Sequence, residues 1–229
     1  MTARHESRYS FCFVAVATLF VTCLLVSNVI AVKLVAIQGL LLPAAIVIFP
    51  ISYLLADVLT EVYGYRAARR VIWLGFFCNL LAVAAIWIGG LLPAAAFWSD
   101  QSAYDKILGA TPRILLASFL AYLVGEFANT MIMSRLKLAT AGRHLWARAI
   151  GSTLVGQGLD SAVFISIAFF GLMPLTTLLG TILTQWLVKS AYEALATPLT
   201  YAIVGFLKRR EGIDTYDRGI SFNPFAFGE

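Results

Sequence analysis

Charged residues are scarce in this chain of 229 residues: Asp, Glu, Lys and Arg together make up 13% of it, against roughly a quarter in an average soluble domain. Hydrophobic residues reach 60%. This combination excludes an ordinary soluble domain and indicates an integral membrane protein. The net charge of +5 does not indicate a nucleic-acid partner, because the basic residues form short clusters between apolar runs.

Histidine and cysteine, which supply much of the nucleophilic and metal-binding chemistry of proteins, are also rare. The two histidines, His5 and His144, lie outside the apolar runs. The three cysteines, Cys12, Cys23 and Cys78, lie inside such runs without metal-ligand spacing. No G-x-S-x-G, H-E-x-x-H or phosphate-binding loop occurs. We therefore expect no metal and no cofactor, and an enzyme is only a third interpretation.

Long apolar runs are abundant instead, and a helix needs about 20 such residues to cross a bilayer. The sequence predicts an all-α protein with six transmembrane helices, at about 11–32, 40–62, 70–92, 113–135, 146–170 and 175–206. The second is the least regular because Pro43 and Pro50 interrupt it, and Pro198 is expected to kink or end the last. The first run is too long for the core of a cleaved signal peptide.

The distribution of basic residues supports six spans with both termini in the cytoplasm. One side receives 13 of the 17 Lys and Arg, namely Arg4, Arg8, Arg66, Arg69, Arg70, Arg135, Lys137, Arg143, Arg148, Lys208, Arg209, Arg210 and Arg218. We expect one transport domain over residues 1–210 and a mobile cytoplasmic tail over 211–229. The exterior segment 93–112 fits an interfacial loop better than a lid, and both stay open.

Polar side chains inside the predicted spans are the candidate functional residues. An ionisable group at the centre of a membrane helix costs roughly 2.5–3.5 kcal/mol and persists mainly where it serves a site or a path. In the last span, Gln185, Lys189 and Glu193 stand four residues apart and form one polar stripe. By depth, the candidate substrate-binding residues are Asn28, Asp57, Asn79, Glu126, Asn129, Gln157, Asp160, Phe164, Gln185, Trp186, Lys189 and Glu193.

Two successive spans contain similar polar segments, LVGEFANT at 123–130 and LVGQGLDS at 154–161. On antiparallel helices Glu126 and Gln157 reach the same depth, and the glycines allow close approach of the backbones. Generic small-residue packing explains this similarity equally well. Glu61 is interpreted as a surface ion pair near Arg66, and serine and threonine hydroxyls as interhelical hydrogen bonds.

Carboxylates outnumber lysines in and at the edges of the spans, so some must be protonated, neutralised by a cation or hydrated. This excess leaves room for proton coupling, and Lys189 with Glu193 would suit a paired gate or relay. Carboxylates, amides and aromatic planes such as Phe164 and Trp186 together suit a flat heterocycle. A guanine-like edge would offer N–H donors to a carboxylate and its carbonyl to an amide or ammonium.

Several stretches together resemble one bacterial family. SNVIAVKLV (27–35), FPISYLLADVLTEVYGYRAARR (49–70), ILGATPRILLASFLAYLVGEFANT (107–130), GQGLDS (156–161) and QWLVKSAYE (185–193) resemble the queuosine precursor transporters, earlier described as vitamin uptake transporters. The D-x-x-x-E-x-Y-G stretch at 57–64 is the most specific part. The resemblance implies a six-helix inner-membrane importer of 7-deazaguanines such as 7-cyano-7-deazaguanine or its aminomethyl form. It also implies a fold like the substrate-binding (S-component) subunits of energy-coupling-factor vitamin importers.

The alternative is a vitamin-binding subunit that needs a separate energising module, because the same fold would serve both. The expected partners are the small-molecule substrate and the lipid bilayer, with no nucleic acid. A homodimer stays open, as do the carried 7-deazapurine and the driving force.

Overall fold

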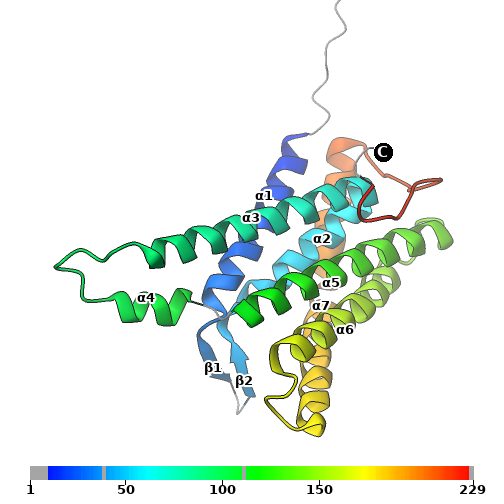
Figure 1. Cartoon of the computed structure of the whole chain (residues 1–229). Helices are drawn as coiled ribbons and strands as arrows, with labels where there is room; N and C mark the ends of the chain where they lie inside the picture. Colours follow the sequence, from blue (N-terminus) through cyan, green and yellow to red (C-terminus); the bar gives the residue numbers. More distant parts are fainter. Residues whose placement is uncertain (1–9, 38–39, 110–111, 227–229) are drawn as a thin grey trace, which may run out of the picture.

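A computed structural model describes residues 10–37, 40–109 and 112–226, and it is almost entirely helical (Figure 1). Arg4 and Arg8, which entered the topology prediction, lie outside the described residues. The elements, in chain order, are α1 (Phe11–Ile30), β1 (Leu34–Ile37), β2 (Leu40–Pro43), the short 3-10 helix η1 (Ala44–Val47), α2 (Phe49–Tyr63), α3 (Tyr65–Leu91), α4 (Gln101–Leu108), α5 (Pro112–Ala139), α6 (Leu145–Phe169) and α7 (Leu175–Glu211).

Four segments in the described part of the chain are long and apolar enough to cross a membrane: Phe11–Ile30, Tyr65–Leu91, Gln101–Ala139, which contains α5, and Leu145–Phe169. Their outward faces carry large apolar side chains, for example Leu19, Phe77 and Leu120. Carboxylates and amides are buried inside. This inside-out distribution of polarity is that of an all-α, multi-pass membrane protein.

The short helix α2 lies at the centre of the bundle. Every residue from Ser52 to Val62 is buried, since α1, α3, α5 and α7 all pack against it. A helix that is covered on all sides is normally apolar all round. Here the covered residues include Asp57 and Glu61, which are 0% and 1% exposed. The centre of the fold is therefore partly ionic.

The second predicted span, 40–62, is wrong as a continuous helix. Its first residues form an antiparallel hairpin in which β1 pairs with β2, from Leu34 opposite Pro43 to Ile37 opposite Leu40. Helix α2 begins only at Phe49, so that Pro50 falls in its first turn, where the missing N–H has no helical partner to lose. The α-helix itself is only 15 residues long.

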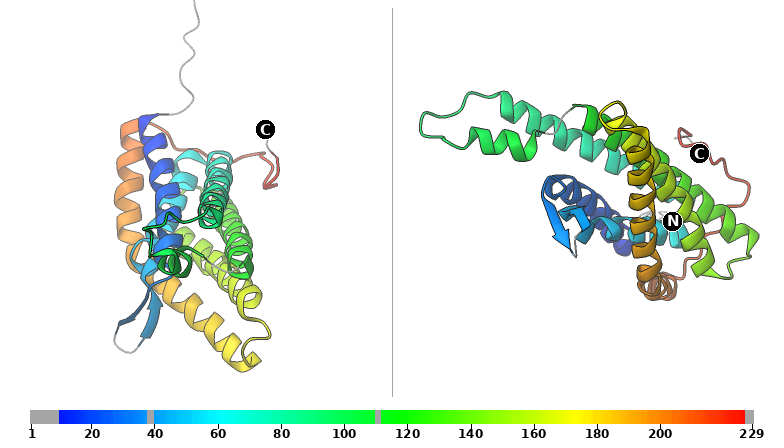
Figure 2. Two further views of the ribbon diagram at one scale, coloured as in Figure 1. Left: turned by 60° about the vertical axis from the view of Figure 1, so that its left-hand side comes forward. Right: turned by 90° about the horizontal axis from the view of Figure 1, so that it is seen from below.

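The connection 93–112, which the sequence predicted to be exterior, contains a short helix that the sequence interpretation did not include. Within it, α4 folds back toward the end of α3, and the Tyr104 hydroxyl donates to the Ile86 carbonyl at 2.8 Å. Figures 1 and 2 show this α3–α4 connection projecting beyond the bundle.

Helix α7 continues through Pro198 to Glu211, beyond the end at 206 that the sequence predicted. Figure 2 shows its axis change direction along its length, which a proline inside a helix explains. Its C-terminal half packs inward through Glu193, Thr197, Thr200 and Val204. Its N-terminal half lies mainly along α6 and is largely exposed, with Leu183 and Leu187 each about half accessible.

Candidate functional site

Four carboxylates from four helices meet in the interior of the bundle. Asp57 on α2, Glu126 on α5, Asp160 on α6 and Glu193 on α7 are each at least nine-tenths buried. Glu126 interacts electrostatically with the other three, and Glu193 also with Asp57. We call these four residues the acid cluster. The sequence predicted all four as candidates, and the fold brings them together.

Two of these carboxylates have a partner on a neighbouring helix. The Asn129 amide donates to Asp57 Oδ1 at 2.8 Å, and Lys189 Nζ lies 2.5 Å from Asp160 Oδ2. The structure thus gives Lys189 an ion pair with Asp160. A pairing of Lys189 with Glu193 stays a prediction.

Other oxygens of the same region lack a hydrogen-bond partner among the described residues: Asp57 Oδ2, Glu126 Oε2, Asn129 Oδ1 and Gln157 Oε1. A buried polar atom left without a partner costs about 1–3 kcal/mol. Unsatisfied acceptors from α2, α5 and α6 therefore mark a place where a molecule with N–H donors would gain much from binding. No three His, Cys, Asp or Glu side chains in the described chain are arranged to hold a metal ion.

The acid cluster depends on a close crossing of α5 and α6. A Cβ built on Gly156 would lie 2.8 Å from Asn129 Cβ, and one on Gly125 would lie 2.8 Å from Asp160 Cβ. A Cβ built on either glycine would also lie about 3 Å from the backbone carbonyl oxygen of the other glycine. The two similar segments at 123–130 and 154–161 thus face each other across these glycines. The crossing sets the positions of the polar side chains on both helices.

Tyr53 on α2 is a member of this region that the sequence interpretation missed. It is buried, its side chain is hydrogen-bonded with that of Gln157, and it interacts electrostatically with Glu126, Asp160 and Glu193. A tyrosine in an apolar run is typical of packing, and only its place four residues before Asp57 would have put it on the same helix face.

The acid cluster lies in a part of the chain that is similar to known proteins. A family model described as "Putative vitamin uptake transporter" matches residues 43–203. The chain belongs to this family. The match begins at the end of β2 and includes all four carboxylates of the acid cluster.

Three relatives of this family member are named after queuosine. A "Probable queuosine precursor transporter" of Bacillus subtilis (strain 168) is 34% identical over 179 residues, which cover 77% of each chain. A protein of the same name from Haemophilus influenzae is 30% identical over 53% of this chain and 49% of its own length. The "Queuosine precursor transporter" of Escherichia coli (strain K12) is 29% identical, over 53% and 52%. No solved structure matches, so the likeness to energy-coupling-factor subunits stays a prediction.

The remaining predicted residues of this family member lie in other surroundings. Asn28 on α1 donates to Asn79 on α3 at 2.9 Å. The Trp186 indole donates to the Leu154 carbonyl at 2.8 Å, and the Phe164 ring packs edge-on against Phe169. Gln185 has a buried Oε1 without a partner among the described residues. Substrate contacts by these side chains stay predictions.

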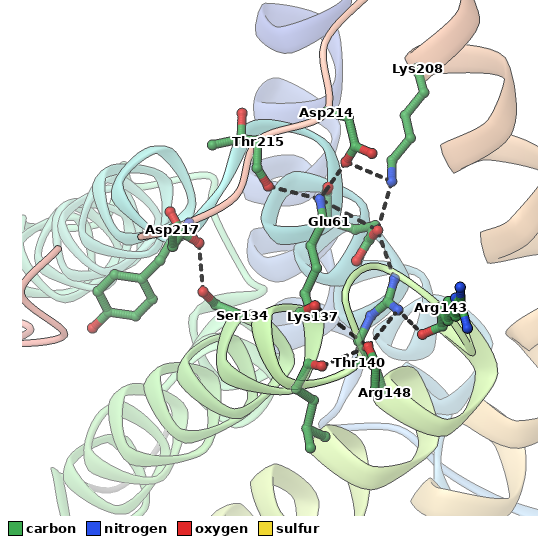
Figure 3. Close-up of polar contacts among 12 residues, drawn as sticks. Glu61, Ser134, Lys137, Thr140, Arg143, Arg148, Lys208, Asp214, Thr215 and Asp217 are labelled. Carbon is green, nitrogen blue, oxygen red and sulfur yellow. Dashed lines mark hydrogen bonds and ion pairs between the residues drawn. The ribbon is translucent and has the colours of Figure 1, made fainter. Parts of the chain in front are cut away.

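A second ionic group lies toward the end of the bundle where α1 begins and the tail is found (Figures 1 and 3). Glu61 Oε1 lies 2.8 Å from Arg148 on α6, 2.7 Å from Lys208 on α7 and 3.5 Å from Lys137 on α5. Asp214 of the tail pairs with Lys137 at 2.5 Å and with Lys208 at 2.8 Å. We call these five residues the Glu61 network. The interpretation of Glu61 as a surface ion pair is therefore wrong.

Each carboxylate of the Glu61 network lies beside at least two cations, and the pKa of Asp214 reflects this surrounding positive charge. Burial alone would raise this pKa, but hydrogen bonds from Lys137 and Lys208 and their positive charges outweigh burial and hold it below its ordinary value. Lys137 also donates to the Glu61 and Thr215 carbonyls. The network thus ties α2, α5, α6, α7 and the tail together.

The described residues of the tail, 211–226, make specific contacts with the bundle, and the mobility expected of the tail stays a prediction. The Asp217 carboxylate accepts from the Tyr65 backbone N–H at 2.8 Å and from the Ser134 hydroxyl at 2.6 Å. Gly64 turns the chain between α2 and α3 with φ +85°, and a Cβ there would lie 2.7 Å from Thr215. Asp217 thus caps the start of α3 by accepting from a backbone N–H that has no partner within the helix.

Further along the tail, backbone carbonyls accept hydrogen bonds from side chains of α3. Tyr65 donates to Phe222, Arg69 to Asn223 and Trp73 to Pro224, at 2.8–2.9 Å. The Trp73 ring also lies 5.6 Å from that of Phe225. The tail therefore follows α3 for about two helical turns.

An open groove of about 410 Å³ lies elsewhere, between residues 13–22 of α1 and 70–74 of α3. Its walls are almost entirely apolar. Such a surface suits contact with lipid chains and contributes nothing to the acid cluster.

Proposed function

We propose that this protein imports queuosine precursors, 7-cyano-7-deazaguanine and its 7-aminomethyl form, across the bacterial inner membrane. The observation that carries the proposal is the acid cluster with its unsatisfied buried acceptors at the centre of a multi-pass protein. Relatives named as queuosine precursor transporters support a queuosine precursor as the solute, and the resemblance of the sequence to that family implies the two 7-deazaguanines. A purine-like ring with adjacent N–H donors matches acceptors of this kind.

The proposed contacts are those that the structure leaves open. Glu126 Oε2 has no described partner, so Glu126 would accept the ring and exocyclic N–H groups. Asp160 is the weaker candidate because Lys189 already pairs with it. Lys189, or the Gln157 amide, would donate to the ring carbonyl. Gln157 lies on α6, which forms the crossing with α5, and Lys189 lies on α7, which packs against α6.

The proposed topology has six spans with both termini in the cytoplasm, and α2 and α7 complete the set. Helix α2 is short and central, and polar side chains such as Lys189 interrupt the apolar character of α7. The start of α1 and the tail lie at one end of the molecule (Figure 1), which agrees with termini on one side. The Glu61 network would then lie at the cytoplasmic surface.

Uptake by a bacterial strain that lacks its own importer tests the proposal. Glu126→Ala and Asp160→Ala should each abolish accumulation of the labelled 7-deazaguanines while the protein stays in the membrane fraction. Asp100→Ala is the matched control, because Asp100 is an exposed carboxylate far along the chain from the acid cluster. Normal uptake by both cluster variants would refute the placement of the site.

The family description favours a second candidate, a vitamin-binding subunit that depends on a separate energising module. Liposomes that contain only the purified chain separate the two functions. Accumulation of 7-deazaguanines in these liposomes supports a self-sufficient transporter. Binding without accumulation supports the module-dependent subunit. Recovery of the solute chemically unchanged is expected in either case, since we propose no catalytic activity.

A further inference from the structure

The acid cluster has more carboxyl groups than the cationic residues around it can pair. Four carboxylates interact there, and the ion pairs of the described residues give them one cationic partner, Lys189. Arg148, Lys137 and Lys208 lie near α2 as well, but Glu61 and Asp214 engage them. After the Lys189–Asp160 pair, Asp57, Glu126 and Glu193 remain.

A guanine-like edge requires only one of these three carboxylates, because its two adjacent N–H groups bind one bidentate acceptor. Asp57 Oδ2 and Glu126 Oε2 are both unpartnered in the described structure and both more than nine-tenths buried. They also belong to different helices, α2 and α5. A solute that satisfied only the ring-edge acceptor would leave the other carboxylate buried without a counter-charge.

The two proposed precursors differ in the one group that matters here. A primary alkyl amine has a pKa of about 10, so the aminomethyl form is a cation at neutral pH. The nitrile is neutral and is only a hydrogen-bond acceptor. A carboxylate repels an acceptor, whereas it forms a short charge-assisted hydrogen bond with an ammonium.

We propose that the acid cluster selects a cationic, amine-bearing 7-deazaguanine over its neutral nitrile analogue. This inference rests on the proposed function. One carboxylate holds the amino-pyrimidinone edge, and a second, from Asp57, Glu126 or Glu193, binds the ammonium. The preference for the amine is expected to be at least about tenfold in Kd, which corresponds to about 1.4 kcal/mol.

Isothermal titration of the detergent-solubilised full chain with the aminomethyl form, the nitrile form and guanine measures this preference. Three charge-neutralising, isosteric variants locate it: Asp57→Asn, Glu126→Gln and Glu193→Gln. At least one of them should lower the amine-to-nitrile preference toward one while its nitrile affinity stays within about threefold of the unmodified chain. Retained nitrile binding also shows that this variant is folded. Asp100→Asn should leave the preference unchanged.

Equal affinities, or a preference for the nitrile, would overturn the inference while leaving the proposed function intact. A preference that persists undiminished in all three variants would overturn it as well, since the discrimination would then arise elsewhere. Absence of binding by all three ring compounds would instead contradict the proposed function itself.

Discussion

Asp57 and Glu61 are two acidic residues one turn apart on α2. Both are fully buried, but their side chains have opposite surroundings. Glu61 meets three cations and is a centre of the Glu61 network. Asp57 meets one amide, has an unpartnered oxygen and lies beside further carboxylates. A paired charge in the interior holds elements together, whereas an incompletely paired one stores free energy that a ligand can release.

The same contrast separates the two ends of the family's D-x-x-x-E-x-Y-G stretch. Asp57 opens it in the acid cluster. Glu61, Tyr63 and Gly64 close it among structural contacts, and the Tyr63 hydroxyl donates to Glu211 at 2.7 Å. One short sequence thus contributes to the acid cluster at one end and to structural contacts at the other.

The largest expected effect comes from breaking the Glu61 network. Glu61→Gln removes the negative charge that faces Arg148, Lys137 and Lys208, and an uncompensated buried charge costs roughly 3–5 kcal/mol. The midpoint of thermal unfolding in detergent should fall steeply. Asp57→Asn is the matched comparison, and its midpoint should be equal or higher because it relieves repulsion in the acid cluster. A lower midpoint for Asp57→Asn than for Glu61→Gln would contradict the distinction.

The next effect concerns the crossing of α5 and α6. Gly156→Leu places a side chain where even a Cβ would lie 2.8 Å from Asn129 Cβ, so the helices must separate. Overpacking of this kind costs about 1–3 kcal/mol and would move Asn129 away from Asp57. Uptake should fall at least tenfold. Gly180→Leu is the control, because nothing lies within 4 Å of a Cβ there. Equal uptake by both would show that the crossing does not position the site.

A smaller effect is expected at the tail. Asp217→Ala removes the acceptor for the Tyr65 N–H and the Ser134 hydroxyl, which is equivalent to losing a helix cap and costs roughly 1–2 kcal/mol. The unfolding midpoint should fall modestly, and proteolysis should cut the tail faster. Arg218→Ala, at the exposed neighbouring position, should change neither property. A protease-sensitive tail in the unmodified chain would contradict its docking.

The smallest effect is a pH dependence at Asp214. Its pKa is lower in the folded chain than the ordinary value of about 3.9, so its contribution to stability is complete above that value. The contribution disappears as pH falls through the lower folded-state pKa. Asp214→Asn should therefore destabilise the protein slightly at neutral pH, because this carboxylate is partly exposed, and the difference should disappear once the pH is below the folded-state pKa.

The parts of the fold that sequence predicted are those with long uninterrupted apolar runs. Helices α1, α3, α5 and α6 are of this kind. The run from Leu34 to Val47 is just as apolar, but apolarity does not distinguish a strand from a helix. The two prolines at 43 and 50 decided the outcome by confining the helix to the residues after Ile48.

The site could also be predicted only in part. Depth along a helix is readable from sequence, so Glu126 and Gln157 could be placed at the same depth. The sequence does not show which neighbouring helix a side chain faces, because that requires knowing how the helices are arranged around one another. For this reason the hydrogen bond from Trp186 to the backbone of α6 and the partners of Glu61 were not predicted.

The contact between Trp73 and the tail supplies an optical probe of this end of the bundle. Its indole N–H is held by the Pro224 carbonyl and its ring lies against Phe225. Replacing Trp87, Trp98, Trp146 and Trp186 by phenylalanine would leave Trp73 as the sole indole of the 229-residue chain. Its emission wavelength and quenching would then report directly, without any attached dye, whether Pro224 and Phe225 stay in contact with α3.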